Sequence, residues 1–165
     1  MTSILKVSEI QDPTNSNTAL TIDSSGRIFT PARPAFKAYR STNGDVTYAG
    51  GAVVSADMDT TEFNQGGHYN TSTGIFTAPV DGIYHFGISL FNNSTSVQRC
   101  SISVTPHGVS NRFAGQGQRS QYNDFSVSGI IELTSGNTVY VTTSYSSTII
   151  YQGNSHSFFW GYLIG

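Results

Sequence analysis

Histidines and carboxylates are the side chains of this sequence that could carry out acid–base or metal chemistry. No two histidines stand four residues apart, the spacing of a helical zinc site, and no Gly-x-Ser-x-Gly segment forms a nucleophile turn. His85 falls on the polar side of an alternating segment and is interpreted as a packed or exposed spacer. The four histidines, which we predict have no catalytic role, are His68, His85, His107 and His156. We therefore predict no catalytic residue and no enzyme activity.

Two aspartates and the single cysteine are the remaining candidates for a metal site. Asp57 and Asp59 could offer oxygen ligands to calcium, but the Gly and Glu of a calcium loop are missing, so a solvated acidic turn explains them better. Cys100 alternates with Ile102 and Val104, which is typical of a small core residue, and one cysteine excludes an internal disulfide. We predict no metal and no cofactor.

Two segments rich in Gly, Ser, Asn and Gln are predicted to be binding loops, His107–Asp124 and Ser146–His156. They combine aromatic anchors with adaptable polar side chains, as antibody loops do. The two arginines could meet phosphate or carboxylate groups of surface glycans, although two solvated arginines explain them equally well. The predicted receptor-contact residues are Arg112, Phe113, Arg119, Tyr122 and Tyr151. The glycines of Phe113–Ser120 follow no strand–helix unit, so we predict no phosphate cradle there.

Composition predicts that these residues are carried by strands. The chain has 165 residues, of which 12% are aromatic and only 11% charged, with 17 glycines. Aromatic and β-branched side chains fit a pleated sheet, and Gly and Asn supply turns. The net charge of −2 with eight Lys and Arg leaves no basic stripe for nucleic acid.

Apolar residues alternate with polar ones over many short segments. One face is formed by alternate residues of 84–90 and another by alternate residues of 125–133, and no segment has a helical period. This pattern predicts an all-β, antiparallel sandwich.

Residues 1–33 differ from the rest and are predicted to form a separate N-terminal segment. The turn sequence Asp23–Gly26 lies between two short extended runs, which predicts a hairpin. Pro31 and Pro34 then predict an extended, polyproline-like joint. The main domain is predicted to span residues 34–165.

The closing segment Ser157–Gly165 is apolar on both faces. Its aromatic side chains Phe158, Trp160 and Tyr162 would fall on one face, with Phe159 on the other. Leaving such a face in water would expose a large apolar patch, so we expect one face to meet another subunit. A central strand buried within one domain is the alternative, which we disfavour because the end of a chain is usually peripheral.

No segment of the sequence predicts export or membrane insertion. The first twelve residues lack a charged and then apolar signal pattern, and no run of about 18 apolar residues occurs. We expect synthesis in a cytoplasm.

An ordered set of aromatic and turn residues resembles the globular head of complement component one, subcomponent q, a family that shares the jelly-roll fold of tumour necrosis factor. The matching residues are Asn64, Tyr69, Phe76, Gly82, Tyr84 and Phe86. The flanking segments "PAFKAYR" and "FFWGYLI" look like the opening and closing strands of that family. Met58 and Ile88 replace aromatic residues of the pattern, a change that a core tolerates.

The resemblance implies a homotrimeric jelly roll that binds other molecules and does not transform them. Its aromatic residues are expected in the core or the trimer interface: Phe76, Tyr84, Phe86, Phe158, Trp160 and Tyr162. No Gly-X-Y repeat is present, so a collagen stalk is not expected.

Residues 3–36 resemble the leader of fibre and appendage proteins of bacteriophages, particularly those of marine bacteria. This resemblance implies a virion protein whose N-terminal segment docks on other virion proteins. We expect a tail fibre or receptor-binding tip that contacts a host surface glycan or protein. The alternative is a capsid decoration or structural joint without a receptor role.

Overall fold

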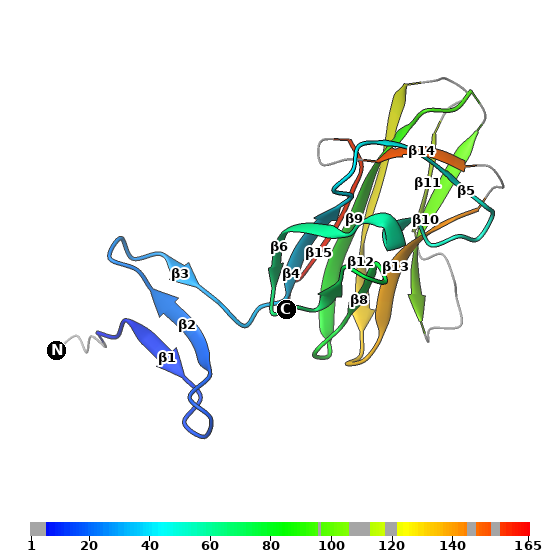
Figure 1. Cartoon of the computed structure of the whole chain (residues 1–165). Coiled ribbons are helices and arrows are strands. Elements are labelled where there is room, and N and C mark those ends of the chain that lie inside the picture. Colours follow the sequence, from blue (N-terminus) through cyan, green and yellow to red (C-terminus); the bar gives the residue numbers. More distant parts are fainter. Residues whose placement is uncertain (1–5, 96, 106–112, 118–121, 145–147, 153–155) are drawn as a thin grey trace. The chain divides into compact units, whose positions relative to one another are not determined.

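The computed structural model describes residues 6–95, 97–105, 113–117, 122–144, 148–152 and 156–165. The chain divides into two compact units, Met1–Arg33 and Pro34–Gly165, here called the N-terminal unit and the head (Figure 1).

The N-terminal unit is a three-stranded antiparallel sheet of β1 (Glu9–Gln11), β2 (Thr18–Ile22) and β3 (Ile28–Phe29), in that order. β2 and β3 form the predicted hairpin, with Ile22 opposite Ile28, so this prediction is confirmed. β1 pairs with the other side of β2, an addition that the sequence analysis did not foresee.

The segment that follows the N-terminal sheet is a turn, and the predicted polyproline-like extension is wrong. The amide of Arg33 donates to the carbonyl of Thr30 over 3.1 Å, which closes a four-residue turn. Pro31 occupies the second position of that turn, where its fixed φ is favourable.

The head is a sandwich of two antiparallel sheets (Figure 1). The five-stranded sheet has the order β11 (Phe113–Gly117), β10 (Gln98–Thr105), β13 (Thr138–Thr143), β8 (Ile75–Thr77) and β7 (Tyr69–Asn70). The seven-stranded sheet runs β5 (Gly44–Tyr48), β14 (Thr148–Gln152), β9 (Gly82–Asn92), β15 (Phe158–Leu163), β4 (Ala35–Tyr39) and β6 (Thr60–Gln65), and β12 (Asn123–Leu133) also pairs with β9. A single 3-10 turn, Val54–Asp57, is the one helical element of the described residues.

Aromatic rings fill the space between the two sheets. Phe36 of β4 stacks on Tyr69 and Phe76, with ring centroids 4.7 and 5.2 Å apart, and meets Phe159 edge-on at 5.0 Å. Phe86 lies 5.3 Å from Phe76. Such pairs add to the stabilisation that burial provides. The aromatic pattern noted in the sequence therefore forms the centre of the core.

Both departures from the family pattern are buried in this core. Met58 is 0% exposed and Ile88 1%, so each apolar replacement fills the interior as expected. Gly74 lies in a turn with φ +69°, where a Cβ would stand 2.0 Å from the carbonyl oxygen of Ser55. Only glycine fits this position without displacing backbone.

Three expectations about strand positions are wrong. The closing strand β15 is central and lies between β4 and β9, not at the edge of the sheet. The predicted loop His107–Asp124 contains β11, which pairs with β10, and Ser146–His156 contains β14, which pairs with β5 and β9. Backbone hydrogen bonds to neighbouring strands form these elements, and strand pairing between distant segments overrides their loop-like composition.

Candidate binding surfaces

The side chains of β15 alternate between the core and the opposite side of the seven-stranded sheet. Phe159 is fully buried, whereas Phe158 and Trp160 are half-buried and Tyr162 is 43% exposed. The predicted aromatic face therefore exists and is turned away from the core. We call the surface formed by His85, Phe158, Trp160 and Tyr162 the β15 face.

Glycine allows the indole of Trp160 to lie flat across the neighbouring strand. Trp160 stands opposite Gly87 of β9, and a Cβ at Gly87 would lie 2.1 Å from Cζ2 of the indole. The Trp160 and Tyr162 rings are stacked, with centroids 6.1 Å apart. This close approach makes the middle of the β15 face broad and apolar.

His85 ties the aromatic residues of the β15 face together. Its Nδ1 lies 3.0 Å from the hydroxyl of Tyr162, and its ring meets that of Trp160 edge-on at 4.9 Å. His85 is therefore more than the spacer that alternation predicts. Its contact with Tyr162 could not be predicted from the sequence, because the strand register brings together residues 77 positions apart.

Neighbouring strands extend the apolar surface on both sides. On β12, Ile130 stands opposite His85 and is 61% exposed. On β6, Phe63 stands opposite Lys37 and is 48% exposed. Lys37 lies with its Nζ 5.0 Å from the centre of the Phe158 ring and pairs with Glu62 at 2.5 Å.

A hollow of about 360 Å³ opens on this same side of the sheet. Its walls combine serine hydroxyls of β9 and β12 with aromatic rings of β15. The lining residues are Ile88, Ser89, Ser126, Val127, Ser128, Phe158 and Trp160. The surface thus joins an apolar floor to a few polar groups, the composition of a protein interface.

Three of the predicted core or interface residues belong to the core of a single chain. Phe76, Tyr84 and Phe86 are at most 1% exposed. The Tyr84 hydroxyl donates to the carbonyl of Val80 over 2.8 Å, and burial raises the pKa of this tyrosine. These residues support the fold, while the other three of the set, on β15, are available for contact.

The predicted receptor-contact residues are not brought together in the described part of the chain. Arg112 and Arg119 lie outside the described residues, and Tyr151 is described only as backbone of β14. Tyr122 is 67% exposed with φ +61°, and its ring lies 6.3 Å from that of Phe91.

Phe113 has a packing role that the sequence analysis did not assign. It is half-buried and packs against the core, where its ring lies over Gly129: a Cβ there would stand 2.2 Å from Cζ of Phe113. This leaves Tyr122 as the one candidate contact residue with a described and freely exposed side chain.

Asp57 and Asp59 accept hydrogen bonds from neighbouring segments of the head. The Tyr48 hydroxyl donates to Asp57 over 2.8 Å, and Asp59 accepts bonds from the amide and hydroxyl of Ser41 at 2.7 and 2.8 Å. Burial alone would raise the pKa of Asp59, but the bonds from Ser41 and Thr60 lower it. Asp59 is exposed and Asp57 half-buried, which agrees with the predicted solvated acidic turn, and both carboxylates also accept hydrogen bonds that fix the local structure.

Metal and thiol chemistry find little support in the described residues. Within that part of the chain no three His, Cys, Asp or Glu side chains gather as a metal site would require. Cys100 is fully buried, as expected for a core residue, and burial raises its pKa to about 12. In the same residues, no helix is long and apolar enough to cross a membrane.

Comparison with known proteins agrees with this architecture. The globular domain of zebrafish complement 1qA protein superposes with a TM-score of 0.62 at 18% identity, covering 80% of this chain and 98% of that one. Eiger TNF from S. frugiperda gives 0.67 at 12% identity, covering 81% and 94%. These likenesses confirm the predicted jelly-roll fold.

Comparison of the sequence itself identifies related proteins and a family. Protein HP-25 homolog 1 of Bos taurus is 28% identical over 104 residues, which are 62% of this chain and 47% of that protein. The chain thus spans about half the length of the curated relatives that it matches. The model of the C1q domain matches residues 35–164, which is nearly the whole head. The chain therefore belongs to the C1q domain family.

Proposed function

We propose that this chain is the receptor-binding subunit of a bacteriophage virion, in which three heads associate through their β15 faces. The observation that carries the proposal is the uncovered aromatic surface of β15, placed at the centre of the larger sheet. In this assembly the N-terminal unit would attach to other virion proteins, and exposed segments of the head would contact the host cell.

The β15 face supports association between heads. The rings of β15 are flanked by exposed apolar side chains, Ile130 of β12 on one side and, beyond Lys37, Phe63 of β6 on the other. Exposed apolar surfaces of this kind on soluble proteins mark interaction sites. C1q and tumour-necrosis-factor-like domains typically form homotrimers. The trimer is thus the assembly that best accounts for an exposed Tyr162 beside Trp160 and His85.

Binding is the activity that the family favours. C1q and tumour-necrosis-factor-like domains are generally binding or structural domains and not enzymes. Tyr122 supports a contact role in the head because two thirds of its side chain is exposed, and tyrosine is a rigid aromatic anchor with a polar tip.

The virion setting rests on the N-terminal residues. They lie outside the C1q match at 35–164 and form their own unit up to Arg33. Their resemblance to phage appendage leaders is the reason for placing the protein on a virion and for expecting a bacterial surface glycan or protein as receptor.

Two matched substitutions on the head separate assembly from receptor contact. Tyr162→Glu puts a charge on the β15 face, so light scattering should find one chain per particle where the unmodified protein has three. Tyr122→Glu should leave three chains per particle but reduce adsorption of the labelled protein to bacteria, because it replaces the proposed contact residue. The bacteria tested are hosts of phages whose appendage proteins have N-terminal leaders similar to residues 3–36.

Three outcomes would each contradict a different part of the proposal. A single chain per particle in the unmodified protein would contradict the trimer. A stable trimer that neither adsorbs to cells nor blocks phage adsorption, and that binds capsid or tail particles, would favour the structural joint. Equal adsorption by the Tyr122→Glu variant would move the contact away from Tyr122.

A further inference from the structure

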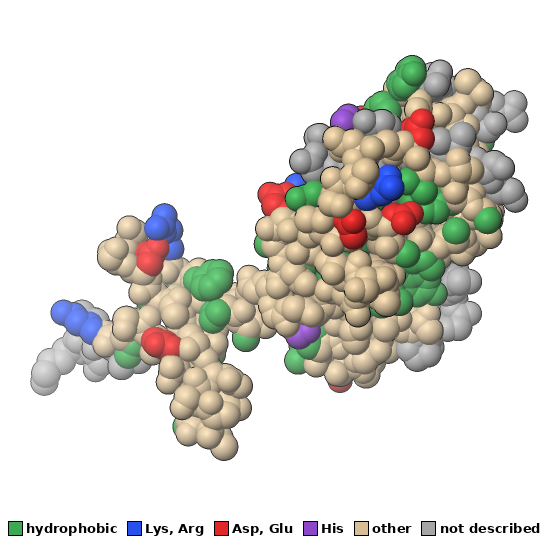
Figure 2. Space-filling model, in the orientation of Figure 1, with side chains coloured by type: hydrophobic (Ala, Val, Ile, Leu, Met, Phe, Trp, Pro, Cys, Tyr) green, Lys and Arg blue, Asp and Glu red, His purple; other side chains and the backbone are tan. Residues whose placement is uncertain are grey.

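The N-terminal unit has no core of its own. None of its described residues, 6–33, is buried, and its strands present large apolar side chains to solvent: Ile28 is 69% exposed and Ile10 44%. Figure 2 shows hydrophobic side chains, in green, open at the surface of this unit. A sheet that leaves its aliphatic residues in water lacks the main source of folding stability.

Strand register collects these aliphatic residues on one side of the sheet. Ile10 stands opposite Leu20, and Ile22 stands opposite Ile28. Leu20 and Ile22 are two residues apart on β2, so their side chains point to the same face. We call this surface, formed by Ile10, Leu20, Ile22 and Ile28, the aliphatic face.

The other side of the small sheet has a different character. A row across the three strands places Glu9 and Phe29 on either side of Thr21. A carboxylate at this position makes burial of that side costly. The aliphatic face is therefore the side that a partner would cover.

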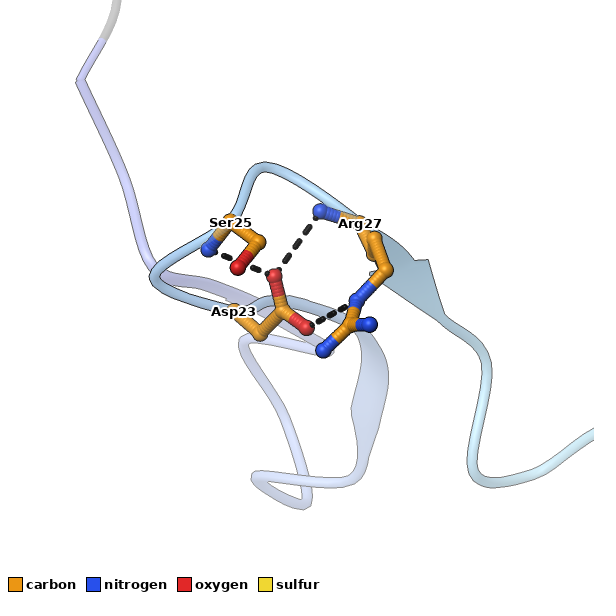
Figure 3. Close-up of polar contacts among 3 residues, drawn as sticks. All are labelled: Asp23, Ser25 and Arg27. Carbon is orange, nitrogen blue, oxygen red and sulfur yellow. Dashed lines mark hydrogen bonds and ion pairs between the residues drawn. The ribbon is translucent and has the colours of Figure 1, made fainter.

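The turn between β2 and β3 fixes this arrangement (Figure 3). The carboxylate of Asp23 accepts bonds from the amides of Ser25 and Arg27 at 2.8 and 3.0 Å and from Nε of Arg27 at 2.6 Å. The bond from the Arg27 amide is the main cause that lowers the pKa of Asp23. The turn sets the register, and the register decides which side chains share a face.

Units of this size need help to fold. Domains below about 40 residues usually depend on disulfides, metals or association with other chains. The only cysteine of the sequence is Cys100, in the head, and no described residues gather as a metal site. Association is the remaining means of stabilisation.

We infer that the aliphatic faces of three N-terminal units pack against one another, so that the unit folds as part of a trimer of this chain. This inference rests on the proposed trimer of heads. The four side chains of the aliphatic face are uncharged, and two charged residues, Lys6 and Asp23, line the hollow beside Ile22 at its edge. Copies of the four side chains can therefore meet without burying a charge.

The small size of the aliphatic face favours a second copy over a foreign protein. Four side chains cover much less than the roughly 800 Å² per partner of a stable interface between separate proteins. Copies held together by their heads meet at an effective concentration of about millimolar, at which a small apolar contact is sufficient. Attachment to the virion would then use other surfaces of the unit.

Cysteine cross-linking tests which face the copies share. Ile28→Cys and Phe29→Cys are a matched pair, since both side chains are more than half exposed and adjacent residues of a strand point to opposite faces. Cys100 is buried with its pKa raised to about 12, so it stays unreactive in both variants. Mild oxidation of the full-length protein should link chains through position 28 at least tenfold faster than through position 29.

Hydrogen exchange supplies a second measurement without substitution of the aliphatic face. In the unmodified trimer the amides of β1 and β2 should exchange at least tenfold more slowly than in the monomeric Tyr162→Glu variant.

The outcomes distinguish this inference from the proposed function. A trimer by light scattering with equal cross-linking at both positions, or without protection of β1 and β2, would overturn the packing of the units while the trimer of heads stands. In that case a virion protein would cover the aliphatic face. A monomer at every concentration would overturn both.

Discussion

The head and the N-terminal unit are both antiparallel β-structure, yet only one of them has an interior. In the head, two sheets enclose rings such as Phe36, Phe76 and Phe86, each at most 1% exposed. The N-terminal unit consists of a single sheet, and none of its described residues is buried. Turn chemistry and alternation therefore suffice to define strands, while a second layer is what provides an interior.

The two units differ in the number of packed sheets and not in how well their local sequences form strands and turns. The N-terminal hairpin has a well-bonded turn at Asp23 and aliphatic pairs across its strands. In the head, segments distant in the sequence pair within one sheet, as β15 does with β4, and a second sheet covers the first. Stability in this chain is thus expected to be concentrated in the head, and four substitutions test that expectation.

The largest effect is expected at the centre of the head. Phe36→Ala removes a ring that contacts four other aromatic residues, and loss of a buried Phe costs about 3–5 kcal/mol of unfolding free energy. Phe29→Ala, the same change in the N-terminal unit, should alter unfolding of the head by less than about 0.5 kcal/mol. Urea unfolding followed by fluorescence of Trp160, at one fixed protein concentration, measures both. Similar losses in the two variants would contradict the contrast.

An intermediate effect is expected from a buried hydroxyl. Tyr69 donates to the carbonyls of Ser55 and Met58, both at 3.1 Å, so Tyr69→Phe should cost about 1–2 kcal/mol at pH 7.5. Burial, with a smaller contribution from Asp59, raises the pKa of Tyr69 above its ordinary value of 10.0.

The raised pKa gives this penalty a pH dependence. Stability from the buried neutral hydroxyl is complete below pH 10 and falls above it, because the unfolded chain then ionises Tyr69 and the folded chain does not. The Tyr69→Phe penalty should therefore shrink between pH 7.5 and 10.5 in urea titrations. A constant penalty would show that the folded protein ionises Tyr69 as easily as the unfolded one.

The smallest effect on the head is expected from the turn of the N-terminal unit. Asp23→Ala removes three hydrogen bonds, one of which is also an exposed ion pair with Arg27, and all of them lie within that unit. The melting temperature of the head should stay within about 2 °C of the unmodified protein, while amides of β2 exchange faster. A larger shift would mean that the stability of the head depends on the N-terminal unit.

Alternation predicted the sandwich, and the ordered aromatic pattern predicted its family. Both depend on local spacing: residues two apart share a face of a strand, so the aromatic side of β15 and the core side of β9 could be read from the sequence. Met58 and Ile88 were also correctly expected in the core, because apolar volume is what the core requires.

Strand neighbours could not be predicted in the same way. β11 and β14 were missed because their strand character comes from pairing with β10 and β5, and glycine-rich composition concealed it. For the same reason the apolar residues that flank the β15 face could not be predicted. Ile130 and Phe63 lie beside it only through the registers of their strands with β9 and β4. The prediction of an extended joint at Pro31 was wrong because proline fits both an extended segment and a turn.

The central place of β15 has a consequence for how the protein is made. β4 is among the first parts of the head to leave the ribosome, but its neighbour in the sheet, β15, comes more than a hundred residues later. At roughly 5–20 residues per second the nascent chain waits about 6–25 s before the gap between β4 and β9 can be filled. Until then both strands present open edges, so the larger sheet closes only after synthesis of its last strand, and a chaperone that shields those edges would raise the yield of folded protein.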